Sequence, residues 1–102
     1  MTDPGAAELD KVIAQATVDA NGEDEQLMGF HDVLEENLAV PFDTIVLGVP
    51  VTVKSVTLTS SGITAICVRG KYQQQIHLLD LPLPTPPPPG AHWIAAYRRW
   101  AG

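Results

Sequence analysis

The chain has 102 residues, of which 45% are hydrophobic and 18% are charged, and its formal net charge is -6. This length suits one small domain and excludes two domains with independent cores. The composition is that of a folded globular chain and not of a disordered one. No apolar stretch is long enough to span a bilayer, and MTDPGAAELD at the start lacks a secretory signal pattern. We therefore expect a cytoplasmic protein with no membrane partner.

The charge is divided unevenly along the chain. Residues 1–43 contain eleven acidic residues and one base, Lys11, which gives this part a net charge of -10. Residues 44–102 contain five bases and one acid, Asp80, which gives +4. The opposite signs favour docking of the two parts. The excess negative charge attracts cations and repels nucleic acid, so we expect no nucleic-acid partner.

The first predicted helix runs from about Pro4 to Ala20. Its apolar residues recur at the spacing of one helical face. These residues are Leu9, Val12, Ile13, Ala16 and Ala20. Asp3 is the predicted cap, with Pro4 at the first helical position. Asn21 and Gly22 are the predicted stop, because both residue types tolerate the left-handed conformation that closes a helix.

A second helix is predicted from about Glu23 to Leu38, with acidic residues in its first turn, where the helix dipole favours them. Successive residues are about 100° apart, so one face is apolar and the opposite face is acidic. The apolar stripe consists of Leu27, Phe30, Leu34 and Leu38. The acidic side consists of Glu25, Asp32 and Glu36. Pro41 is expected to end the helix.

Between residues 44 and 79 the chain is rich in Val, Ile and Thr, which favours strands. The predicted strands are residues 44–48, 51–59, 63–69 and 72–79. The predicted turns are Gly48–Pro50, residues 60–62, and Gly70 with Lys71. The apolar phase slips between Val53 and Val56, which predicts a bulge or bend. We expect a small antiparallel sheet, and one form that such a sheet takes is curled like an SH3-type barrel.

Residues 81–90, LPLPTPPPPG, contain six prolines and are expected to form an extended spacer or brace. The following AHWIAAYRRW places Trp93, Tyr97 and Trp100 on one face of a short helix, which is expected to pack on the core. We therefore expect an α+β fold, with two N-terminal helices and a C-terminal helix on the sheet. The single domain has an acidic helical part (1–43), strands (44–80), a proline-rich connection (81–90) and a helix (91–100).

The stretch DANGEDEQ, residues 19–26, looks like a calcium loop because acidic and amide oxygens alternate around a glycine. An EF-hand loop needs glycine at position 6 and a bidentate glutamate at position 12. Counted from Asp19, these positions hold Asp24 and Phe30. We therefore do not expect an EF-hand.

Calcium binding does not require that loop, since the ion accepts six to eight oxygens in flexible geometry. Eight acids lie between Asp19 and Asp43, and no base lies between Lys11 and Lys54 to offset them. An ordinary exposed helix mixes the two signs of charge. The alternative is that the acids of the second helix form only the solvated face of an amphipathic helix.

Other groups of potential metal-binding or catalytic residues give weaker evidence of a function. The three histidines share no zinc-ligand spacing. Ser60 and Ser61 lie in no nucleophile motif, so we do not expect an enzyme. Cys67 alternates with neighbours in a predicted strand and is expected in the core.

Four stretches together resemble a known family: EDEQLMGFHDVLEENLAVPFD, GITAICVRG, IHLLDLPLP and HWIAAYRRW. They are similar to the bacterial calcium-binding protein family of the cyanobacterial CcbP type, in which an acidic helix ends in Pro-Phe and the chain closes on Trp-x-x-Ala-Tyr-Arg-x-Trp. The matching residues are Pro41, Phe42, Trp93, Ala96, Tyr97, Arg98 and Trp100. The resemblance covers about residues 19–100. It implies a compact α+β domain that binds calcium through its acidic surface without an EF-hand.

We therefore expect Ca²⁺ at one or two sites on the acidic surface. The candidate ligands are Glu23, Asp24, Glu25, Asp32, Glu35, Glu36 and Asp43. Glu25, Asp32 and Glu36 are the first choice because they share a face, and Glu35 with Asp43 is expected to reach a second ion. The expected affinity is on the order of micromolar to tens of micromolar, which suits a buffer. The alternative is a metal-free interaction module whose acidic helix meets a basic protein surface.

Overall fold

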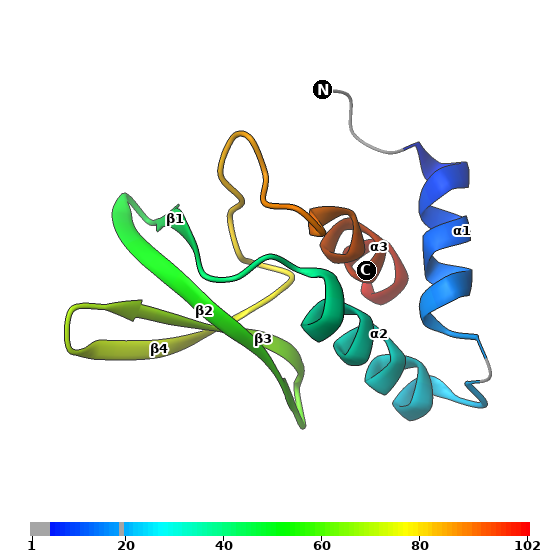
Figure 1. Cartoon of the computed structure of the whole chain (residues 1–102). Helices are drawn as coiled ribbons and strands as arrows, with labels where there is room; N and C mark the ends of the chain where they lie inside the picture. Colours follow the sequence, from blue (N-terminus) through cyan, green and yellow to red (C-terminus); the bar gives the residue numbers. More distant parts are fainter. Residues whose placement is uncertain (1–4, 19) are drawn as a thin grey trace.

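The computed structural model describes residues 5–18 and 20–102, which form three helices and a four-stranded antiparallel sheet (Figure 1). The helices are α1 (Ala6–Ala16), α2 (Glu23–Asn37) and α3 (Ala91–Ala101). The strands are β1 (Phe42–Val46), β2 (Val49–Thr59), β3 (Gly62–Arg69) and β4 (Tyr72–His77). The predicted α+β fold, with helices at both ends of the chain, is confirmed.

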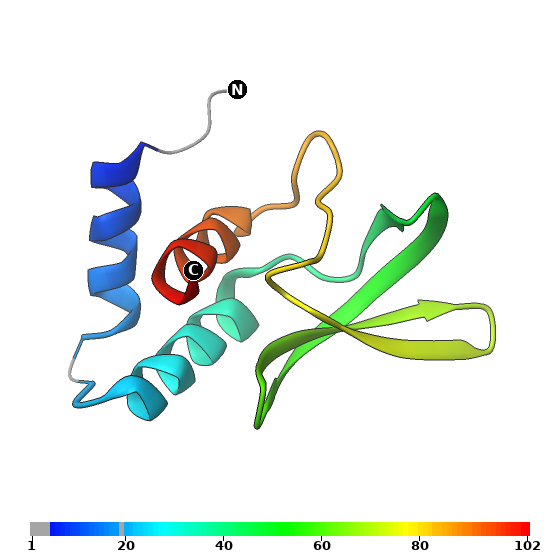
Figure 2. The ribbon, with the colours of Figure 1, turned by 180° about the vertical axis from the view of Figure 1, so that it is seen from behind.

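The three helices lie together on one side of the molecule and the sheet lies on the other (Figures 1 and 2). α2 packs on β2 and β3, whereas α1 packs on α2 and α3. β4 contacts β3, and its first four residues are exposed. Within the described ranges no helix is long and apolar enough to cross a bilayer.

The second predicted helix is confirmed as α2, with its apolar stripe toward the core. Phe30 and Leu34 are fully buried, and Leu38, the C-cap residue, is 5% exposed. Leu27 is half-buried at the edge of the same core. Complete burial of one such side chain stabilises the fold by about 1.5–3 kcal/mol. α2 therefore contacts both of the other helices and two strands of the sheet.

The first helix ends earlier than predicted. α1 stops at Ala16 instead of Ala20, and Asn21 with Gly22 does not close it. Thr17 closes it, since its backbone N–H and its hydroxyl both donate to the carbonyl of Ile13, at 3.0 and 2.8 Å. This side-chain bond competes with continuation of the helix. Gly22 is instead the N-cap residue of α2.

The start of α1 also differs from the predicted cap. The helix begins at Ala6, after the N-cap residue Gly5. The predicted cap, Asp3 followed by Pro4, lies outside the described residues, as does Asp19. The helix therefore begins two residues later than the predicted Pro4.

The sheet is a meander in which the strand order follows the chain, so β1 and β4 form its edges. The predicted bulge in β2 is confirmed. Val53 lies opposite Cys67 and Ser55 lies opposite Ile66, which leaves Lys54 as the extra residue between them. A bulge bends a strand and increases its twist. This bend gives the sheet its curvature beside the helices.

The first hairpin turn consists of Leu47 and Gly48, and not of Gly48–Pro50 as predicted. Val46 pairs with Val49, so two residues connect the strands. Both have positive φ angles, 51° and 77°, as a type I′ turn requires. Pro50 lies in β2 before the part that pairs with β3, so its missing N–H costs no hydrogen bond to β3.

The proline-rich segment joins the end of α2 to the edge of the sheet. The Thr44 hydroxyl of β1 donates to the carbonyl of Pro82, at 2.7 Å. The N–H of Ala39, just after α2, donates to the carbonyl of Pro89, at 2.8 Å. Pro88, which lies between Pro82 and Pro89 in the sequence, is buried. The segment therefore acts as a brace within the chain.

α3 carries the predicted aromatic stripe to the core. Tyr97 is 3% exposed, and its ring meets Phe30 of α2 edge-on, with 5.6 Å between ring centroids. Trp100 lies 5.2 Å from Phe30, and its Nε1–H donates to Gln26 Oε1, at 2.9 Å. The Tyr97 hydroxyl accepts the N–H of Ile63, at 3.2 Å. α3 is thereby attached to both α2 and the start of β3.

β4 ends at His77 and not at residue 79 as predicted. The chain that follows it is held by Arg98 of α3. Its Nε donates to the carbonyl of Leu78, at 3.1 Å, and its Nη2 donates to the carbonyl of Leu81. Burial lowers the pKa of Arg98, and the charge of Asp80 opposes this shift. The guanidinium therefore provides hydrogen-bond donors for two backbone carbonyls of the segment that follows β4.

Replacing Arg98 with Met is expected to destabilise the fold by about 2–4 kcal/mol, because two charge-assisted hydrogen bonds are lost. Urea unfolding followed by circular dichroism measures this change. Arg99→Met is the matched control, since Arg99 pairs with Asp10 of α1 at 2.8 Å on an exposed surface, and its effect is expected to be smaller. Equal losses in the two variants would contradict the role assigned to Arg98.

The contact between α1 and α2 depends on a glycine. A β-carbon at Gly29 would overlap the carbonyl oxygen of Ala16. Gly29→Ala is therefore expected to destabilise the protein by about 1–3 kcal/mol, although alanine normally favours a helix. Gly5→Ala is the control without an overlap, because a β-carbon there has no atom within 4 Å, and its loss is limited to the poorer N-cap preference of alanine. A higher melting temperature for the Gly29 variant would contradict this close packing.

Candidate cation-binding site

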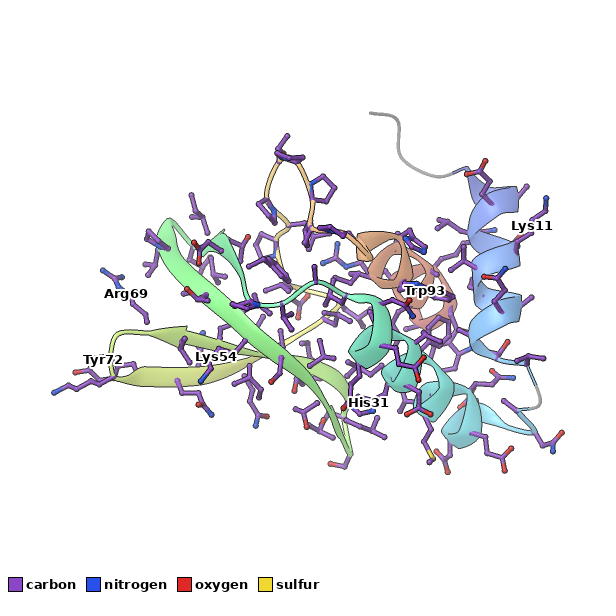
Figure 3. All side chains as sticks on the ribbon, viewed as in Figure 1. Lys11, His31, Lys54, Arg69, Tyr72 and Trp93 are labelled. Atoms are coloured by element: carbon purple, nitrogen blue, oxygen red, sulfur yellow. The ribbon has the colours of Figure 1, made fainter. Side chains whose placement is uncertain are left out.

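The acids of α2 form an exposed surface, which we call the α2 acidic face. It consists of Glu23, Asp24, Glu25, Asp32, Glu35 and Glu36. The bases lie elsewhere, since Lys11 is on α1 and Lys54 and Arg69 are on the sheet (Figure 3). In the part of the chain that the structure describes, no lysine or arginine forms an ion pair with this face. Its charge is therefore left to ions from solution.

Glu25 has a structural contact at the start of α2. Its Oε2 accepts the backbone N–H of Asn21, at 2.7 Å. The N-cap residue, Gly22, has no side chain to cap the helix. Glu25, in the third helical position, thus reaches one residue further back than the glutamate of a capping box, which bonds the N–H of the N-cap residue. One oxygen of Glu25 is thus engaged in closing the turn before α2.

The first-choice ligand set separates along the helix axis. Asp32 and Glu36 are one turn apart, a rise of about 6 Å, whereas Glu25 precedes Asp32 by about 10.5 Å. Ca²⁺ holds its oxygens at about 2.3–2.6 Å, so two ligands of one ion lie within about 5 Å. Asp32 and Glu36, four residues apart, are neighbours on the helix surface, whereas Glu25 lies about two turns from Asp32. The described residues contain no group of three His, Cys, Asp or Glu side chains placed for a metal.

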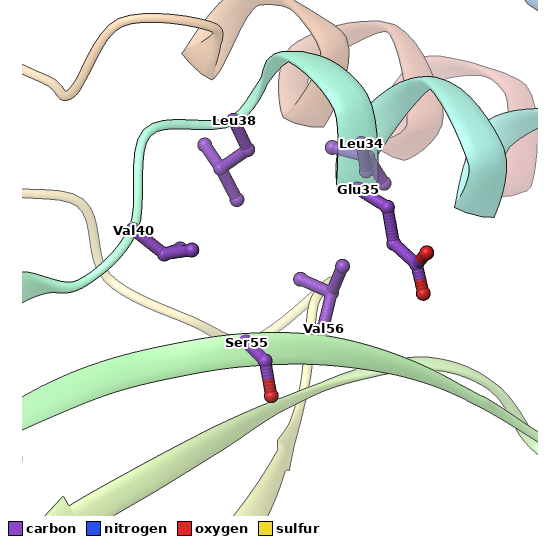
Figure 4. A pocket seen from close by; sticks show the side chains of 6 residues that line it. All are labelled: Leu34, Glu35, Leu38, Val40, Ser55 and Val56. Carbon is purple, nitrogen blue, oxygen red and sulfur yellow. The ribbon is translucent and has the colours of Figure 1, made fainter.

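Glu35 and Asp43, the predicted second site, lie in different surroundings. Glu35 Oε1 is 3.0 Å from Nε2 of His31. Glu35 also borders a pocket of about 200 Å³ between α2 and β2 (Figure 4). The other residues that line this pocket are apolar, except for Ser55. Asp43 accepts the Thr52 hydroxyl, at 2.7 Å, and borders another pocket beside the proline-rich segment. The structure does not bring these two carboxylates together.

Glu23 and Asp24 border a pocket of about 410 Å³, which we call the α2–α3 pocket. It lies between the start of α2, the turn between β2 and β3, the chain after β4, and the end of α3. Its walls include Glu23, Asp24, Ser60, Ser61, Leu79 and Trp100. This pocket was not predicted from the sequence, because the serines belong to a turn and Trp100 belongs to the aromatic stripe that packs on the core. No local pattern connects residues so far apart in the chain.

Cys67 is in the core, as predicted, with 1% of its surface exposed. Burial raises the pKa of its thiol, so the sulfur stays protonated at neutral pH. A buried, protonated thiol is a poor nucleophile and a poor metal ligand. The chemistry of the described surface is therefore carried by carboxylates and not by sulfur.

Comparison of the chain with protein-family models, with curated proteins and with solved structures found no match. The resemblance to the CcbP-type family thus rests on the sequence motifs and stays a prediction. In the structure, Tyr97 and Arg98 of the terminal motif make the packing and hydrogen-bonding contacts described above. These motif residues stabilise the fold. The motif therefore does not identify the calcium ligands, which have to be chosen among the acidic residues.

Glu25→Ala is expected to destabilise the protein by about 0.5–1 kcal/mol, since the Asn21 N–H loses its acceptor at the start of α2. Glu36→Ala is the control, because it removes a like charge one turn from Asp32 and is expected to be neutral or stabilising by a few tenths of a kcal/mol. Thermal unfolding at low salt separates the two variants. A stabilised Glu25 variant would contradict the capping role.

Proposed function

We propose that the protein binds Ca²⁺ through the α2 acidic face, without an EF-hand. The observation that carries this proposal is the uncompensated charge: six carboxylates on a helix of 15 residues, with no lysine or arginine paired to them in the described ranges. Like charges one turn apart destabilise a helix by about 0.2–0.5 kcal/mol per pair. A divalent ion relieves this repulsion, and an ion that binds the folded state stabilises it.

Asp32 and Glu36 are the pair that we place at the centre of the site. Both are exposed, with 72% of the Asp32 side chain accessible, and they lie on adjacent turns. Glu25 and Glu35 already have partners, Asn21 and His31. Two carboxylates and bound water can supply the six to eight oxygens that the ion takes.

This geometry favours weaker binding than the sequence suggested. Ca²⁺ sites gain affinity from the number of charged ligands and from the rigidity of the site. Two exposed carboxylates on one helix supply little of either, so we expect a dissociation constant on the order of 10⁻⁴ M. The remaining acids of α2 raise the local concentration of the ion through their combined field. A weak site of this kind suits a buffer that releases calcium readily.

The double variant Asp32→Asn with Glu36→Gln is expected to weaken Ca²⁺ binding at least about tenfold, a change of about 1.4 kcal/mol, in titration calorimetry. Glu23→Gln with Asp24→Asn is the matched control, because it removes the same charge from the same helix. Its affinity is expected to fall by less than about threefold, through the weaker field alone. Mg²⁺, titrated in parallel, shows whether the site prefers the larger ion.

Two outcomes would contradict the proposal. The first is no heat with Ca²⁺ at millimolar concentration, together with an unchanged melting temperature. The second is an equal loss of affinity in the two double variants, since this would indicate diffuse attraction and no site at Asp32 and Glu36.

The alternative function is a metal-free interaction module whose acidic helix meets a basic protein surface. The observation that favours it is the lack of a three-ligand group among the described residues. A lysine-rich peptide that binds in the presence of a chelator, and that loses binding in the Asp32 and Glu36 variant, would support this alternative. Binding that requires Ca²⁺ would argue against it.

A further inference from the structure

We propose that the α2–α3 pocket binds an organic cation, namely a primary ammonium or guanidinium group on a short alkyl stem. The proposal rests on the combination of acidic and apolar walls in one cavity. It concerns a ligand and residues other than the Ca²⁺ pair, Asp32 and Glu36.

The acidic part of the pocket comes from Glu23 and Asp24, in the first turn of α2. Ala101, at the end of α3, also lines it. The amino end of α2 contributes about +0.5 charge and the carboxyl end of α3 about -0.5, so the two helix ends nearly cancel. The two carboxylates therefore dominate, and the pocket has a local charge of about -2. This sign selects a cation.

The apolar part of the pocket comes from Leu27, Leu79 and Trp100. Leu79 is 44% exposed, so this wall is open to a ligand. A hydrated metal ion gains nothing from apolar walls, whereas an alkyl stem loses water-exposed surface against them. An aromatic ring also attracts ammonium and guanidinium groups. The mixed lining thus favours an organic cation over Ca²⁺.

Trp100 is held in place before any ligand binds. Its indole N–H donates to Gln26 Oε1, at 2.9 Å, and its ring lies 5.2 Å from that of Phe30. A wall that is already ordered loses little conformational entropy on binding. The pocket is therefore organised by the contact between α2 and α3.

The size of the pocket agrees with this ligand. Its volume of about 410 Å³ lies in the range of small-molecule sites, about 300–1,000 Å³. Among the described residues that line it there is no lysine, arginine or histidine. The chain thus presents two carboxylates here without a basic side chain of its own between them.

The test uses n-butylammonium and n-butylguanidinium as probes, with n-butanol as the uncharged control and ammonium as the control without a stem. Trp100 fluorescence in a Trp93→Phe background reports binding, because Trp100 lines the pocket. We expect both charged probes with a stem to saturate, and both controls to bind at least about tenfold more weakly.

Matched variants locate the site. Glu23→Gln with Asp24→Asn is expected to weaken binding of the probes at least about tenfold, whereas Asp32→Asn with Glu36→Gln leaves it within about threefold. Leu79→Lys is a second variant, at an exposed position, and its ammonium is expected to repel the probes without unfolding the protein. These variants invert the order expected for Ca²⁺, so the two proposals fail separately.

Spermidine and an acetylated tripeptide amide with a central lysine or arginine distinguish the source of the cation. Tighter binding of spermidine supports a free polyamine, and tighter binding of a peptide supports a side chain of a partner protein. No saturation by any charged probe at tens of millimolar would overturn the proposal. Equal binding of n-butanol, or equal losses in the two double variants, would also overturn it.

Discussion

Tyr97 of α3 contacts both α2 and the start of β3, so its position fixes how α3 lies against the other layers. Its ring packs on Phe30, and its hydroxyl accepts a backbone N–H at the start of β3. Gly62 makes this approach possible, since a β-carbon there would come within 2.9 Å of the hydroxyl. Among the described residues, α1 packs on the other helices and not on the sheet, so its place follows from theirs. Tyr97 thus adds a hydrogen-bonded connection to the direct packing of α2 on β2 and β3.

The arginines of α3 explain why the acidic charge of the protein remains available. The sequence predicted that the opposite charges of the two parts favour docking and leave an excess of negative charge. In the structure, Arg98 donates to two backbone carbonyls and Arg99 pairs with Asp10 of α1. The sheet carries its bases away from α2 (Figure 3). These basic side chains therefore bond to other parts of the fold or lie away from α2. They do not neutralise the negative charge of α2.

The two sites proposed on α2 differ in the kind of cation that they suit. Asp32 and Glu36 lie on an open helical surface, where a strongly hydrated ion can keep most of its water. Glu23 and Asp24 adjoin the apolar wall formed by Leu79 and Trp100, where a weakly hydrated organic group gains from losing water. Charge alone does not separate these sites. The neighbouring apolar surface does.

Elements that depend on near neighbours could be predicted from the sequence alone: the stripe of α2, the bulge of β2 and the aromatic face of α3. Their periodicities are local, so a linear pattern reveals them. Helical projection placed Glu25 beside Asp32, but it ignores the rise along the axis, which separates them by about 10.5 Å. The early end of α1 at Ala16 has a local cause, the bond of the Thr17 hydroxyl to the carbonyl of Ile13 four residues before it. That Glu23 and Trp100 line one pocket depends instead on contacts between distant segments, for which the chain carries no local signal.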